Sequence, residues 1–103
     1  MMNRGSEMAG QKRLLQLTIY REFFDEIAHG RKTEEYREQK DYWATRLEGR
    51  QYDTIIFRNG YGPDVPEMEV EFKGVRKTTR KGDAVYAIKL GKILSLKRWT
   101  GPA

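Results

Sequence analysis

The sequence predicts a small α+β domain, mainly β, in which five or six short strands form a mostly antiparallel barrel with two short helices at its ends. Three observations carry this prediction. A chain of 103 residues is long enough for one modest core. Five segments have the length and apolar alternation of strands. Two others place their apolar side chains at helical spacing.

A strand and an amphipathic helix are predicted first. Residues 14–19 (LLQLTI) alternate their apolar positions with period two, as a half-buried strand does. Residues 21–29 follow as a helix whose buried stripe comprises Phe23, Phe24, Ile27 and Ala28. Gly30 stands where a left-handed C-terminal cap belongs, and a cation is favoured at His29 in the last turn. We therefore interpret the only histidine as a helix-end residue rather than a catalytic one.

A more polar strand and helix come next. Residues 33–37 predict a strand whose period of two places Thr33, Glu35 and Arg37 on one face. Residues 41–47 or 48 predict a helix that Gly49 ends. Four of its side chains follow helical spacing: Tyr42, Trp43, Arg46 and Leu47.

Three strands complete the predicted barrel. Residues 51–58 direct Ile55 and Phe57 inward and lead into a turn at 59–63. Residues 67–75 alternate apolar and acidic side chains, and residues 84–94 form the last strand, with a bulge expected at Gly91. Trp99 is interpreted as an apolar plug of the barrel, with a nucleic-acid-stacking tail as the alternative. Residues 13–99 form the expected domain, between a disordered leader at 1–12 and a loose tail at 100–103.

Composition narrows the function classes. The net charge of +5 and the 12% of aromatic residues are typical of partners with phosphates and bases. With no cysteine and one histidine, the sequence predicts no disulfide, no metal site and no cofactor. It has no apolar run long enough to cross a bilayer and no signal peptide, so we expect a cytoplasmic monomer without a membrane partner. A basic patch is predicted in the loop after the fourth strand: Arg76, Lys77, Arg80 and Lys81.

Residues 30–37 (GRKTEEYR) are the most informative segment. A lysine, a carboxylate and a guanidinium would meet there if Glu35 and Arg37 share a strand face and Lys32 lies at its mouth. Such a cluster can bind a nucleobase edge or a phosphate. A solvated edge strand with one ion pair is the alternative, and spacing alone leaves both open.

This segment resembles the central pattern Gly-x-Lys-x-x-Glu-x-Arg of the ASCH domain in the PUA-like superfamily. Gly30, Lys32, Glu35 and Arg37 match it. In strand order the resemblance extends over residues 14–96, although only residues 17–37 are distinctive. It implies a PUA-like barrel and a role in RNA binding, or in chemistry on nucleotides or modified nucleosides. One branch of the family hydrolyses acetylated cytidine with a lysine, a threonine and a glutamate. Lys32 matches that lysine, but Glu35 replaces the threonine, so this amidohydrolase activity is not supported.

We therefore expect an RNA- or nucleotide-binding domain with a cleft lined by Lys32, Glu35 and Arg37. The candidate ligand-binding residues around these three are Tyr42, Trp43, Arg46, Asn59 and Tyr61. The first alternative is a small hydrolase, of ribonuclease or modified-nucleoside amidohydrolase type, in which Lys32 and Glu35 would be catalytic. The second is an adaptor domain whose basic face meets a protein.

Overall fold

The structure, a computed structural model, describes residues 12–100, in which five strands and two α-helices follow one another. Their order and bounds are β1 (Leu14–Thr18), α2 (Arg21–Ala28), β2 (Glu34–Glu38), α3 (Asp41–Leu47), β3 (Thr54–Arg58), β4 (Glu67–Arg80) and β5 (Asp83–Lys97). This confirms a mainly β domain with two short helices. The structure describes only residue 12 of the predicted leader (1–12) and only residue 100 of the predicted tail (100–103); the other residues of both lie outside the described range.

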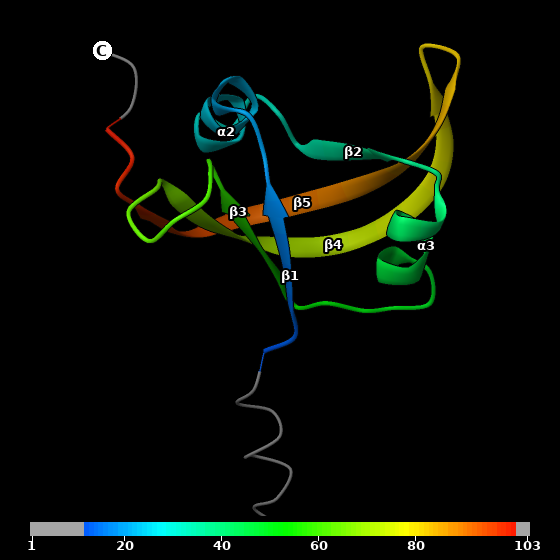
Figure 1. Cartoon of the computed structure of the whole chain (residues 1–103), viewed down its shortest axis with the longest axis horizontal. Coiled ribbons are helices and arrows are strands. Elements are labelled where there is room, and N and C mark those ends of the chain that lie inside the picture. Colours follow the sequence, from blue (N-terminus) through cyan, green and yellow to red (C-terminus); the bar gives the residue numbers. More distant parts are fainter. Residues whose placement is uncertain (1–11, 101–103) are drawn as a thin grey trace, which may run out of the picture.

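The five strands form one sheet in the order β1-β3-β4-β5-β2, in which β1 runs parallel to β3 and the other neighbours are antiparallel. The expected closed barrel is wrong, because β1 and β2 remain the two edges of an open sheet. A side-chain hydrogen bond, rather than backbone pairing, joins these two edge strands. A guanidinium nitrogen of Arg37, in β2, donates to the carbonyl oxygen of Thr18, in β1, at 3.3 Å. Figure 1 shows α2 and α3 at opposite ends of β2.

Strands β4 and β5 form a long, curved hairpin that crosses the whole molecule (Figure 1). The loop expected from Arg76 is strand up to Arg80, and Lys81 and Gly82 make the turn with positive φ angles of 54° and 85°. Register shifts along the hairpin let the strands bend and continue. The bulge expected at Gly91 is confirmed, because Val70 pairs with Ile93 whereas Phe72 pairs with Leu90.

The core lies between the sheet and the two helices. The inward positions predicted for β3 and β4 are confirmed, since Ile55, Phe57, Met68 and Val70 are fully buried. Phe24 and Ile27 of α2 and Leu47 of α3 are the buried residues of the helices. Phe23 is an exception: it was predicted to be buried, but 39% of it is exposed. Successive helical residues point about 100° apart, so Phe24 takes the core position and Phe23 lies at the border of the stripe.

The C-terminal end of the domain docks on α2 through Trp99. Its indole N–H donates to the carboxylate of Asp25 at 2.8 Å, and its ring lies edge-on to His29 with centroids 5.2 Å apart. Trp99 also packs against the core, although the barrel that it was expected to plug is an open sheet. This hydrogen bond, followed by that from Arg21, lowers the pKa of Asp25. The backbone N–H of His29 donates to the carbonyl of Asp25, and Gly30 adopts a φ of 79°, as expected for the helix end.

Replacing Trp99 by Phe removes the indole N–H while keeping a ring beside His29. We expect the pKa of Asp25 to rise toward its ordinary value of 3.8, because the largest cause of its depression is lost. A depressed carboxyl pKa stabilises the fold above the unfolded pKa, and this contribution disappears as the pH falls through the folded pKa. The stability difference between wild type and W99F should therefore shrink below about pH 3.8. An NMR titration of the Asp25 carboxyl carbon in both proteins measures the shift, and identical titrations would contradict it.

Candidate functional site

A cleft of about 630 Å³ lies where the edge strands β1 and β2 approach without pairing. Residues at the end of β1 (Thr18, Ile19) line one side, and residues of β2 (Glu35, Tyr36, Arg37, Glu38) line the other. Trp43 of α3 and the turn after β3 complete the wall. The opening in the sheet is therefore the site's framework, and it brings together segments that are far apart in the sequence.

Glu35 is the centre of this site. The side chain is buried, with 6% of the residue exposed. Lys32 Nζ lies 3.3 Å from Oε1, and Arg37 donates to Oε2 through two nitrogens at 3.0 and 2.7 Å. The period of two along β2 puts Glu35 and Arg37 on one face, as the sequence predicts. Both carboxylate oxygens are thus paired with cations, as a buried charge requires.

Aromatic rings hold the two cations from the other side. The guanidinium of Arg37 lies over the ring of Trp43, 4.9 Å from its centroid. Lys32 Nζ lies 5.2 Å from the centroid of Phe23 and 5.0 Å from that of Tyr36. Each contact adds attraction between a cation and the negative face of a ring. The cluster is therefore a fixed arrangement of charge rather than a solvated surface pair.

Exposed aromatic side chains stand around the cleft. Tyr20 is 75% exposed and Tyr61 is 86% exposed, and both line it together with Phe23. Tyr61 was a candidate from the sequence, whereas Tyr20 and Phe23 were not. The sequence feature that could have identified them is an aromatic pair three residues apart at the start of α2. In the structure the two rings are tilted, with centroids 6.3 Å apart. These rings offer stacking surfaces for a flat ligand.

Lys32 was expected to line the cleft but is not among its lining residues; it contacts three residues that are, namely Glu35, Phe23 and Tyr36. Three other candidates also have surroundings that differ from the prediction. Tyr42 and Arg46 do not line the cleft: the Arg46 guanidinium lies 3.6 Å from the Tyr42 ring centroid, and this stacked pair faces outward on α3. Asn59 does line the cleft, but its side-chain amide donates to the carbonyl of Ile19 at 3.0 Å. Asn59 therefore ties the end of β3 to the end of β1, which is a structural role.

The predicted basic patch divides between two faces of the sheet. In one cross-strand row, Tyr36 and Arg76 flank Ala87, and Arg76 pairs with Glu34 at 2.6 Å. Arg80 lies over the Tyr36 ring, 4.3 Å from its centroid. The Arg76 hydrogen bond, followed by that from Tyr36, lowers the pKa of Glu34. Lys77 belongs to the neighbouring row and so faces the opposite side, that of Arg37. Together with the turn residue Lys81, these side chains form no single surface that faces the cleft.

Across residues 12–100, no three His, Cys, Asp or Glu side chains gather as a metal site would require. None of the helices found there is long and apolar enough to cross a membrane.

Comparison of the chain with protein-family models, with curated proteins and with solved structures finds no match.

Replacing Arg37 by Ala should lower the free energy of unfolding by about 3 kcal/mol, because it leaves a buried carboxylate with one of its two cationic partners. Adding Glu35→Ala should cost less than the sum of the single changes, by about 1–3 kcal/mol, because the two side chains interact directly. Urea denaturation of the four proteins measures this coupling.

Arg31→Ala is the matched control. Arg31 pairs with Glu26 at 2.8 Å, but both side chains are well exposed, at 57% and 44%. Its loss should therefore cost much less than the loss of Arg37, because an exposed ion pair contributes little. Equal costs at Arg31 and Arg37, or strict additivity of Glu35→Ala and Arg37→Ala, would show that the buried cluster does not stabilise the fold.

Proposed function

We propose that this domain is an ASCH-type member of the PUA-like superfamily that binds RNA or a nucleotide in the cleft between β1 and β2. The observation that carries the proposal is the buried Glu35 carboxylate held between Lys32 and Arg37 at the edge of an aromatic-lined cleft. These are three of the four motif positions that the sequence shares with the family. A cleft of about 630 Å³ also has the size of a small-molecule site.

Each part of the cleft has a partner in nucleotide chemistry. Lys32 and Arg37 together carry one more positive charge than Glu35 neutralises, which suits one phosphate or a base carbonyl. The exposed rings of Tyr20 and Tyr61 and the half-buried ring of Trp43 suit a base, and one stacked base contributes about 1–3 kcal/mol. Peptide or adaptor binding explains the rings, but it gives no reason for the buried charge cluster.

The contacts of Glu35 favour binding over hydrolysis. A general base needs an oxygen within reach of the proton that it removes. In Glu35, Arg37 occupies one oxygen and Lys32 the other. The same carboxylate restrains Lys32, the candidate nucleophile of the hydrolase alternative. The cluster is therefore better arranged to hold a ligand than to exchange protons with it.

An NMR titration of the labelled protein with a single-stranded RNA octamer and with cytidine 5′-monophosphate tests the proposal. We expect saturable shifts at residues 18–21, 32–43 and 59–61. Lys32→Ala should weaken binding of the mononucleotide about tenfold, because a charge-assisted contact to phosphate is lost. Binding of the octamer should also weaken with salt, in proportion to the number of phosphates contacted.

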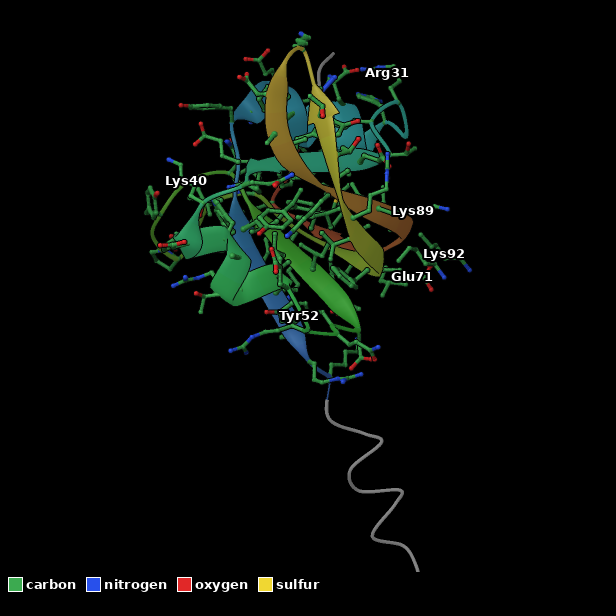
Figure 2. All side chains as sticks on the ribbon, turned by 90° about the vertical axis from the view of Figure 1, so that its right-hand side faces the viewer. Arg31, Lys40, Tyr52, Glu71, Lys89 and Lys92 are labelled. Atoms are coloured by element: carbon green, nitrogen blue, oxygen red, sulfur yellow. The ribbon has the colours of Figure 1, made fainter. Side chains whose placement is uncertain are left out.

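Lys92→Ala removes the same charge on the side of the molecule away from α3, where Lys92 points outward (Figure 2). It should leave mononucleotide binding unchanged. Equal weakening by Lys32→Ala and Lys92→Ala would mean attraction by net charge alone. Appearance of a cleavage product during the titration would favour the hydrolase, and the absence of shifts with either ligand would leave the adaptor.

A further inference from the structure

A second cavity, of about 550 Å³, lies beside the outer half of β4. Residues 48–51, which follow α3, form one wall, and residues of β4 together with Tyr86 of β5 form the other. Its floor is apolar, because Leu47 is fully buried and Phe72 and Val75 pack against the core. No residue lines both this cavity and the cleft. The cavity is therefore a separate feature of the molecule.

The outer half of β4 is an open strand edge. β3 pairs only with residues 67–71, so residues 72–80 of β4 pair with β5 alone. The backbone N–H of Phe72 donates to the carbonyl of Asp53 at 3.1 Å, and within residues 12–100 no backbone hydrogen bond follows on that side of β4. Figure 1 shows this half of the hairpin extending past β3. Such an edge offers unpaired backbone groups to an extended chain.

Three residues direct their backbone groups out of this edge. In an antiparallel pair, successive residues point their N–H and C=O groups alternately toward the partner strand and away from it. Leu90 of β5 donates to Thr33, on the side of β2, and residues 84, 86 and 88 have the same alternation. Their partners in β4 are Thr79, Lys77 and Val75, whose N–H and C=O groups therefore point away from β5. Within residues 12–100, no other strand pairs with these three residues.

The charge of this edge indicates what can pair with it. Residues 72–81 contain five basic side chains and no acidic one. Arg76 and Lys77 are each paired with a glutamate, whereas Arg80 and Lys81 form no ion pair within residues 12–100. The same edge of a second copy of the chain would place like charges opposite one another, which is destabilising. An acidic chain is therefore favoured over a second copy.

The two faces of the edge differ in what surrounds them. Val75 and Lys77 lie on the face of the cavity, whereas Arg76 and Arg80 lie on the face of Tyr36. A strand added at this edge would place every second side chain over the apolar floor of the cavity. The side chains between them would lie beside the two arginines.

The cavity side favours apolar side chains. Tyr86 donates to Oε2 of Glu48 at 2.5 Å, and Lys77 Nζ lies 3.0 Å from the same oxygen. The fixed carboxylate at this wall repels another acidic side chain. Gly49 and Gly74 leave room beside it, since no atom lies within 4 Å of where their Cβ atoms would be. Apolar side chains therefore fit the cavity, and acidic ones fit the opposite face.

We infer that the open edge of β4 binds an extended acidic segment of a partner protein as an added antiparallel strand. Backbone hydrogen bonds to Val75, Lys77 and Thr79 hold the segment, and its apolar side chains enter the cavity. Its acidic side chains lie beside Arg76 and Arg80. Both present neighbours of β4 are antiparallel, and this pairing is the more stable one per residue. The inference is independent of the proposed function of the cleft.

The probe is the acetylated and amidated peptide EIEIEIE, which alternates as the edge requires. In an NMR titration of the labelled protein, we expect saturable amide shifts at Gly74, Val75, Lys77 and Thr79. N-methylation of the central isoleucine should weaken binding at least about tenfold, because its N–H faces β4. N-methylation of the glutamate before it should leave the affinity unchanged, because that N–H faces solvent. The two modified peptides have the same charge and side chains, so a difference between them reports strand pairing.

Thr79→Pro tests the edge from the side of the protein. The N–H of Thr79 lies outside the β4–β5 ladder, and an edge strand tolerates proline at such a position. The variant should keep the spectrum of the folded protein and bind EIEIEIE about tenfold more weakly. Thr79→Ala is the matched control, because it keeps the N–H and should keep the affinity.

Equal weakening by the two N-methylated peptides would overturn the inference in favour of attraction by charge alone. Displacement of EIEIEIE from the β4 edge by the RNA octamer would do the same. Shifts confined to the cleft, or no shifts at all, would also overturn it. Amide shifts at the edge that depend on protein concentration without peptide would mean that a second copy covers it. None of these outcomes changes the cytidine 5′-monophosphate test, so the two proposals fail separately. The N-methyl comparison uses the wild-type protein, so misfolding of a variant does not decide the result.

Discussion

The Glu35 carboxylate is the constraint around which the rest of this structure is arranged. A buried charge is costly unless cations and hydrogen bonds surround it. Here Lys32 comes from the connection before β2, and Arg37 comes from β2 itself. Arg37 also donates a hydrogen bond to the carbonyl oxygen of Thr18 in β1. One ion-paired cluster thus joins the two edge strands through side chains, in the position where a closed barrel would have backbone hydrogen bonds.

Local features of the sequence predict most of the fold. Alternation is a property of neighbouring residues, so the buried faces around Ile55, Phe57, Met68 and Val70 follow from the pattern alone. Closure of the sheet does not follow from the pattern, because it depends on how β1 and β2, which 15 residues of chain separate, meet in space. The length of the β4–β5 hairpin was also underestimated. Its outer part, residues 76–83 (RKTTRKGD), has no apolar residue and resembles a loop in sequence, although residues 76–80 pair with β5 in the structure.

The sequence predicts the position of a candidate site residue only where a single strand or turn determines that position. The positions of Glu35 and Arg37 follow from the strand period, and Lys32 follows from the turn after Gly30. Trp43 lines the cleft but its neighbours Tyr42 and Arg46 do not, because a helix of seven residues offers only one residue per turn to a given side. Tyr20 and Tyr61 border the cleft because β1 and β3 are parallel neighbours that end together. No local pattern encodes that adjacency.

The structure distinguishes two effects of charge that the composition alone does not: the net charge of the whole molecule and the local cluster around Glu35. Several basic side chains of β2–β5 are neutralised in pairs, as Arg58 is by Glu67, Arg76 by Glu34 and Lys77 by Glu48. The net charge of +5 is therefore spread over the surface, where it attracts a polyanion from any direction and is screened by salt. The cluster in the cleft carries a single excess positive charge in fixed geometry, shielded from solvent. Long-range attraction thus belongs to the whole molecule, whereas the proposed function assigns recognition of one phosphate or one base edge to Lys32, Glu35 and Arg37.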